Sequence, residues 1–232
     1  MTTRPPPRSG IFMLVLLLGA VLPARAGTIR GTVRAAPPPG IDAQDSGGAY
    51  ASRKWKFVER IDYAHLTDFV VYLDEPAGQT PPPVHAKEAV TTQKDASFVP
   101  HVLPIAAGTT VRWPNDDDVF HNVYAMSEAK TFNLGLYKSE RVPEITFDKP
   151  GRVDVFCAIH SQMHCIILVL PTPYFAKADA RGRFEIRDVP AGTYKLHAWH
   201  ERLPAKVVEV TVPADGEVTL DLVLGVADLP KY

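Results

Sequence analysis

The sequence is poor in several features that define other classes of protein. It has only two cysteines, Cys157 and Cys165, among 232 residues, so it can form at most one disulfide within the chain. It has no excess of positive charge, because the formal net charge is −1. A nucleic-acid-binding protein needs a basic patch, so this balance argues against a nucleic-acid partner. Internal repeats and low-complexity segments are also missing.

The chain lacks an apolar run long enough to cross a membrane. The run at residues 11–22 has 12 residues, whereas a spanning helix needs about 20. Arg4 and Arg8 precede it and Ala24-Arg25-Ala26 follows it, which is the three-part pattern of a secretory signal peptide. We therefore expect residues 1–26 to be cleaved, with no membrane span afterwards. Cleavage removes three arginines and no acids, which changes the net charge from −1 to −4.

What the sequence does contain is a series of short alternating segments separated by turn residues. The 22 prolines disfavour long helices. Strands are expected at Thr28–Arg34, Asp68–Leu73, Thr109–Trp113, Glu144–Phe147, Arg152–Cys157, Ile166–Leu170, Gly182–Ile186, Thr193–Ala198, Val207–Val212 and Val218–Leu224. The segment Ile166–Leu170 is apolar on both faces, as an inner strand of a sandwich would be. This pattern predicts an all-β protein.

A proline-rich break at Pro171-Thr-Pro173 divides the predicted strands into two groups. We expect one domain over residues 27–171, with its core at 96–170 and with N-terminal strands and an insertion at 27–95. A second small β-sandwich is expected over 172–232. About 60 residues form only a marginal core, so this second unit is expected to pack on the first.

Four side chains form a pattern that is typical of a metal site. Cys157, His160 and Met163 lie three residues apart between two predicted strands, and His121 follows a polar turn 36 residues upstream. In a β-sandwich that distance allows the chain to return to the same end. Thiolate, thioether and imidazole ligands suit copper better than magnesium or calcium. Two imidazoles, one thiolate and a weak axial thioether suit both Cu(I) and Cu(II), as electron transfer requires.

Other interpretations of the same residues remain open. Cys157 and Cys165 would close a small loop if they formed a disulfide, and a buried cysteine is often only a small apolar side chain. Zinc also binds Cys and His, but Met is not among its usual ligands. Asp116–Asp118 is interpreted as a solvated turn, because a calcium site would need further oxygen ligands. The six other histidines lack a spacing partner of comparable quality: His65, His85, His101, His164, His197 and His200.

Neighbouring residues are assigned supporting roles. Asn122, next to His121, is the candidate for a hydrogen bond around the metal ligands. The apolar side chains expected to exclude water are Val119, Phe120, Phe156 and Ile159.

The central part of the chain resembles the cupredoxin family. The resemblance rests on Phe98–Pro100, Gly108–Asn115, Asp118–Tyr124, Phe132–Gly135 and Cys157–Met163. It is similar to plastocyanin and, in the Cys-His-Met spacing, to amicyanin, and it resembles bacterial methylamine-utilisation and plastocyanin-like proteins. The resemblance implies a Greek-key β-sandwich, a single copper ion bound by His121, Cys157, His160 and Met163, and a periplasmic electron carrier that meets a redox partner protein. Amicyanin-type loops usually carry prolines where this chain has Ile159 and Ser161, and Cys165 is not part of the ligand pattern.

The C-terminal part resembles carboxypeptidase-regulatory-like β-sandwich modules, on the segment Gly182–Leu196 and the following Trp199-His200-Glu201. Residues 27–74 carry a weaker hint of the same module. The sequence therefore predicts a type-1 (blue) copper protein that transfers single electrons. The alternatives are a copper trafficking or storage protein and a structural or carbohydrate-binding β module. An enzyme is not expected, because the sequence shows no nucleophile–base pair and no vacant catalytic position.

Overall fold

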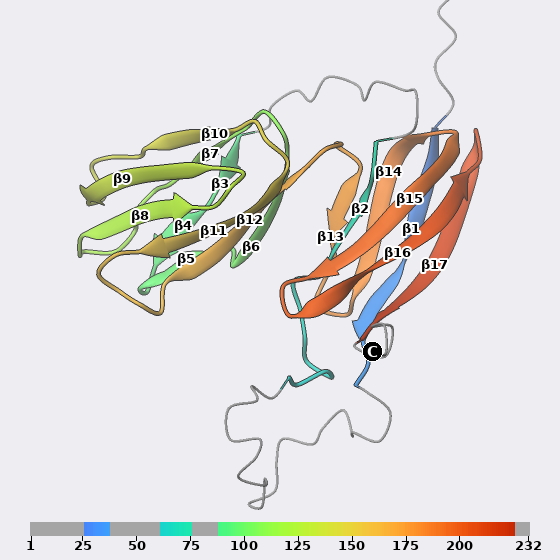
Figure 1. Ribbon diagram of the computed structural model, residues 1–232, viewed down its shortest axis with the longest axis horizontal. Coiled ribbons are helices and arrows are strands. Elements are labelled where there is room, and N and C mark those ends of the chain that lie inside the picture. Colours follow the sequence, from blue (N-terminus) through green and yellow to red (C-terminus); the bar gives the residue numbers. More distant parts are fainter. Residues whose placement is uncertain (1–25, 38–60, 76–87, 226–232) are drawn as a thin grey trace, which may run out of the picture.

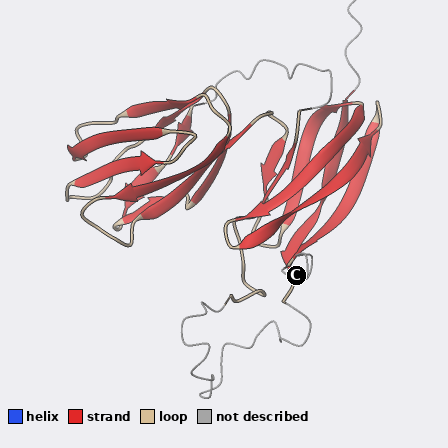
Figure 2. Cartoon of the chain, viewed as in Figure 1, coloured by secondary structure: helices blue, strands red, loops and turns tan. Residues whose placement is uncertain are grey.

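The computed structural model describes residues 26–37, 61–75 and 88–225, and over these residues the protein is all-β, as predicted (Figures 1 and 2). Within the same ranges, no helix has the length and apolar character needed to cross a bilayer. Apart from Ala26, the predicted signal peptide lies outside the described residues.

The strands form two units, which are seen side by side in Figure 1. We call the first the inserted unit; its strands are β3 (Ala89–Val90), β4 (Thr92–Lys94), β5 (Ser97–Val99), β6 (Val102–Ala106), β7 (Thr109–Arg112), β8 (His121–Met126), β9 (Thr131–Tyr137), β10 (Glu144–Phe147), β11 (Gly151–Cys157) and β12 (His164–Leu170). We call the second the outer unit; its strands are β1 (Ala26–Ala35), β2 (Val70–Leu73), β13 (Phe175–Lys177), β14 (Arg183–Pro190), β15 (Gly192–His200), β16 (Leu203–Val212) and β17 (Gly216–Leu224).

The inserted unit is a sandwich built around a five-stranded sheet in the order β6-β12-β11-β8-β9. A three-stranded sheet, β10-β7-β3, and the β4-β5 hairpin complete it. Trp113 and Phe147 are the largest fully buried side chains of its core. Along β11, Val153, Val155 and Cys157 are buried in this core, because alternate residues of a strand share one face.

The outer unit contains strands from both ends of the chain. β1 pairs with β14 and, in parallel, with β17, while β2 pairs with β13 and β15. At Gly31 a Cβ atom would lie 1.7 Å from the carbonyl oxygen of Leu220, so only glycine allows this close approach of β1 to β17. The predicted assignment of residues 27–74 to the domain that ends at 171 therefore differs from the structure. These strands complete the C-terminal sandwich, and the inserted unit lies between β2 and β13 in the chain.

Strand β12 is apolar on both faces because each face packs in a different core. Cys165, Ile167 and Val169 face the core of the inserted unit. Ile166, Leu168 and Leu170 form another cluster, together with apolar residues of β2, β13 and β15. The strand is thus an inner strand, as predicted, but it lies between two units. Burial of these side chains holds the units together.

Candidate metal centre

Two neighbouring strands bring His121 and Cys157 to one end of the inserted unit. His121 is the first residue of β8, and Cys157 is the last residue of β11. The strands are antiparallel neighbours, with Cys157 opposite Val123. Because side chains two residues apart share a face of a strand, His121 lies on the same face as Val123, next to Cys157. The predicted return of the chain to the same end of a sandwich is therefore found.

The loop between β11 and β12 brings His160 to the same point. The Cys157 amide donates to the carbonyl oxygen of Met163 at 3.3 Å, and the Met163 amide donates to that of His160 at 3.0 Å. These bonds close the loop on itself without the prolines found in amicyanin-type loops. Met163 is fully buried in the core that also contains Cys157.

Three of the predicted ligands form a compact donor cluster. The Nδ1 atoms of His121 and His160 are 3.0 Å apart, and the Cys157 sulfur lies 3.9 Å from the first and 3.8 Å from the second. An ion about 2.0–2.1 Å from nitrogen and about 2.3 Å from sulfur needs donor atoms of roughly this mutual separation. His121 and Cys157 are buried, and His160 is partly exposed. The donor set and its spacing therefore fit one transition-metal ion.

Asp117 fixes the orientation of His121. Its carboxylate lies 2.8 Å from Nε2 of His121 and accepts further hydrogen bonds from the backbone amides of Asp95 and Ala96. Burial alone would raise the pKa of this carboxyl, but the bonds from His121 and the two amides outweigh it and lower the pKa below its usual value. An ionised carboxylate only accepts, so Nε2 of His121 carries the hydrogen. In the neutral ring, Nδ1 then presents its lone pair to the cluster, as a metal ligand must.

The sequence did not single out Asp117. Its only signal is its position four residues before His121 in the acidic turn, and this signal does not distinguish it from Asp116 or Asp118. The turn is shaped by Asn115, whose side chain bonds to the carbonyl oxygens of Val119 and Tyr137 and to the amide of Asp117. The turn expected to be solvated therefore includes a carboxylate that positions a predicted ligand.

Asn122 does not have the role expected of it. Its side-chain amide donates to Oδ1 of Asn133 at 2.7 Å, and that oxygen also accepts from the amide of Gly135. These bonds stabilise the β8–β9 hairpin. The carboxylate of Asp117, not the amide of Asn122, supports the donor cluster.

The apolar residues expected to exclude water are substantially exposed. Val119, Phe120 and Ile159 are 49%, 52% and 53% exposed, and Phe156 is 37% exposed. They adjoin the ligands in sequence but face solvent to a large extent. The burial of the cluster comes from the core of the inserted unit beneath it.

The two cysteines do not form a disulfide; both thiols are free and buried. Cys165 lies on β12 opposite Val155, inside the core of the inserted unit. Burial, with a smaller contribution from the charge of Asp154, raises the pKa of its thiol far above the usual range. Cys165 is thus a packed neutral thiol and does not belong to the donor cluster.

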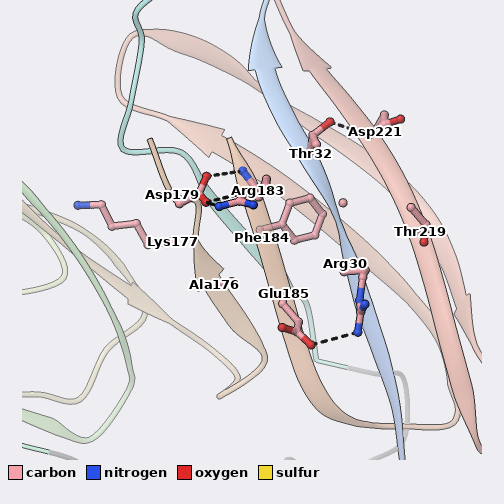
Figure 3. Close-up of a pocket in the computed structure, with 11 residues that line it drawn as sticks. Arg30, Thr32, Ala176, Lys177, Asp179, Arg183, Phe184, Glu185, Thr219 and Asp221 are labelled. Carbon is pink, nitrogen blue, oxygen red and sulfur yellow. Dashed lines mark hydrogen bonds and ion pairs between the residues drawn. The ribbon is translucent and has the colours of Figure 1, made fainter. Parts of the chain in front are cut away.

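A pocket on the outer unit contributes nothing to this cluster. Its lining residues come from β1, β13, β14 and β17 and the β13–β14 connection, and none is a predicted ligand (Figure 3). Charged groups there are already paired, as Figure 3 shows for Arg30 with Glu185 and for Asp179 with Arg183. Phe184, its one aromatic lining residue, is only 5% exposed.

Solved structures that resemble the chain include copper proteins. A copper-containing nitrite reductase from Thermus scotoductus SA-01 is 29% identical over 39% of this chain, with a TM-score of 0.34; the chain spans a quarter (25%) of its length. A purple cupredoxin from Nitrosopumilus maritimus is 26% identical over 35% of this chain and 98% of its own, with a TM-score of 0.32. Amicyanin from Paracoccus versutus is 26% identical over 38% of this chain and 84% of its own, with a TM-score of 0.33.

One family model matches part of the outer unit. Residues 172–220 match the model described as polysaccharide lyase family 4, domain II. The predicted resemblance to carboxypeptidase-regulatory-like modules has no counterpart in this match. Comparison with curated proteins gives no match.

Proposed function

We propose that the protein binds one copper ion through His121, Cys157 and His160, with Met163 as a weak fourth ligand, and that it transfers single electrons in the periplasm. The observation that carries this proposal is the cluster of one thiol and two imidazoles within 3.9 Å of one another. Thiolate and imidazole together favour copper, and an added thioether is unusual for zinc. When bound, copper supplies a one-electron couple between Cu(I) and Cu(II).

The residues of the proposed site have distinct parts in this function. Cys157 supplies the strong thiolate ligand from a buried position. Asp117 holds His121 with its Nδ1 lone pair directed to the cluster, so that the ligands need little rearrangement between oxidation states. His160 is the partly exposed member of the cluster and provides the exit for an electron.

The exposed apolar side chains beside the ligands suit contact with a redox partner protein. Val119 and Phe120 directly precede His121, and Ile159 directly precedes His160. Each is about half exposed. Apolar side chains gathered at a surface mark sites of protein–protein contact. We assign no catalytic role to the cluster.

The proposal is tested by adding Cu(II) to the chain that begins at Gly27 and recording the visible spectrum. We expect an intense thiolate-to-copper band that saturates at one equivalent. Cys157→Ser should lose the band, because the sulfur ligand is removed. Cys165→Ser is the matched control and should keep it, because that thiol lies outside the cluster. Absence of the band from the unsubstituted chain, or its survival in Cys157→Ser, would refute the copper site.

Electron transfer and copper trafficking are separated by redox cycling of the loaded protein. An electron carrier should be reduced and reoxidised repeatedly with its copper retained after desalting. Release of copper on reduction would instead support trafficking or storage and overturn the electron-transfer proposal.

A further inference from the structure

A second group of metal-binding side chains lies where the two units meet. His101 directly precedes β6, His164 is the first residue of β12, and Glu201 lies in the turn between β15 and β16. One ligand atom from each lies within 4.8 Å of those of the other two. His101 Nε2 and Glu201 Oε1 are 3.1 Å apart. Sequence spacing does not reveal this group, because 63 residues separate the two histidines and 100 separate His101 from Glu201.

The hydrogen bonds of His101 leave a place for a cation. Its Nδ1 lies 3.2 Å from the carbonyl oxygen of His164, and its Nε2 faces the Glu201 carboxylate. A carbonyl oxygen and a carboxylate both accept only, and a neutral imidazole has a single N–H. The ring satisfies both neighbours only if it carries a second proton or if a metal ion joins Nε2 to the carboxylate. The arrangement therefore suits a metal ion or a plain ion pair.

His164 is held in the manner of a metal ligand, which favours the metal ion. Its Nε2 lies 2.9 Å from Oδ1 of Asp154, and Arg152 holds that carboxylate with two of its nitrogens. The ring of Phe156 stacks on that of His164, with centroids 4.8 Å apart. A histidine that donates one N–H to a carboxylate keeps a lone pair on its other nitrogen, as in many metal sites. Here that nitrogen is Nδ1.

We propose that His101, His164 and Glu201 bind a divalent transition-metal ion, Zn²⁺ or Cu²⁺, between the two units. Two imidazoles and one carboxylate are a common ligand set for Zn²⁺, and imidazole also suits Cu²⁺. No sulfur takes part, so this set of ligands differs in kind from the one proposed around Cys157. The side chains of His101, His164 and Glu201 are 38%, 27% and 22% exposed, which leaves the ion accessible to water.

This ion would link the two units at the edge of their apolar contact. His101 and His164 belong to the inserted unit, whereas Glu201 belongs to the outer unit. Other contacts cross the same boundary, among them the bond from Lys177 Nζ to the carbonyl oxygen of Val102 at 2.9 Å. The proposal does not depend on copper binding by the first cluster, because no ligand is shared.

The test uses the chain from Gly27 with Cys157→Ser and His160→Gln, which removes two ligands of the first cluster. Zn²⁺ and, in a separate arm, Cu²⁺ are titrated in competition with a chromophoric chelator. We expect one equivalent of metal to be bound. Adding Glu201→Gln or His101→Gln should weaken binding by at least the roughly 10–100-fold seen when outer-shell partners of metal ligands are lost. Cooperative thermal unfolding, followed by circular dichroism, shows that each variant is folded.

His197→Gln is the matched control. His197 also pairs with a carboxylate of the outer unit, Asp74 at 2.8 Å, but lies outside the group of three, so metal affinity should not change. Failure of the folded parent to bind either metal, or equal affinity in Glu201→Gln, would show that His101 and Glu201 form an ion pair only. If the parent does not fold, the same substitutions are compared in the unsubstituted chain. There Glu201→Gln must lose one equivalent of bound metal, and an unchanged stoichiometry would overturn the proposal.

Discussion

The two donor clusters differ in how the chain assembles them. The first lies inside one unit, where two neighbouring strands and one short loop supply every donor. The second lies between units and needs a residue from the β15–β16 turn. The first is mostly buried and contains sulfur, whereas the second is partly exposed and contains only nitrogen and oxygen. A local loop thus gives a ligand set that sequence spacing can reveal, but a junction between units gives one that only the fold reveals.

Each cluster has its own supporting carboxylate. Exchanging either carboxylate for an amide should produce the largest difference between the metal affinities of the two clusters. Asp117→Asn loosens His121 and should weaken copper binding at the first cluster by about 10–100-fold, with zinc binding at the second unchanged. Asp154→Asn loosens His164 and should have the opposite pattern. Chelator competition measures both affinities in both variants. If either variant weakened both clusters equally, the clusters would not be independent.

Substitutions on the two faces of β12 test the packing between the units and should have smaller effects. Ile166 is buried between the units, and Ile167 is buried in the inserted core. Ile→Val at either position should lower the free energy of unfolding by about 0.5–1.5 kcal/mol, measured by denaturant titration. Ile166→Val should also weaken metal binding by the second cluster, whereas Ile167→Val should not. No loss of stability in Ile166→Val would mean that the units are not packed together in solution.

An effect of similar small size concerns the outer unit alone. Burial, with a smaller contribution from Tyr174, raises the pKa of Tyr194 above its ordinary value. The unfolded chain therefore releases this proton first, so the stability that the neutral phenol contributes is present below pH about 10 and is lost as the pH rises further.

Tyr194→Phe should remove this loss. At neutral pH the variant should be less stable by about 1 kcal/mol, because it lacks the 2.8 Å hydrogen bond to the carbonyl oxygen of Pro190. The difference should shrink above pH about 10. Urea unfolding across this pH range measures the difference in the free energy of unfolding. Parallel curves of stability against pH for the two proteins would contradict a raised pKa of Tyr194.

Local patterns in the sequence predicted the all-β class, and His121, Cys157 and His160 do lie together. Strand alternation reflects which face is buried, so β11 and β17 were recognisable from their own residues. The ligand loop is short enough that spacing alone constrains its geometry. The copper ion, the part played by Met163 and the periplasmic location stay predictions.

Pairing between distant segments left no comparable signal. The partners of β1 are about 150 residues or more away, so the pairing of Ile29 with the C-terminal strands was signalled only by the weaker resemblance of residues 27–74 to the C-terminal module. Asp117 was indistinguishable from its acidic neighbours, because its role depends on the amides of Asp95 and Ala96. The role proposed for Glu201 was likewise not visible in the sequence, because its partner His101 belongs to the other unit.

The position of the inserted unit between β2 and β13 has a consequence for biosynthesis. Domains generally fold as units while the chain is still being made. The inserted unit is complete once Leu170 has emerged, but β1 must wait for β14 and β17 before it has any partner. The first strand of the described residues is therefore among the last to pair. Truncation at residue 171 would leave β1 and β2 permanently unpaired, whereas a cut on each side of residues 88–170 would leave the inserted unit with all its strands.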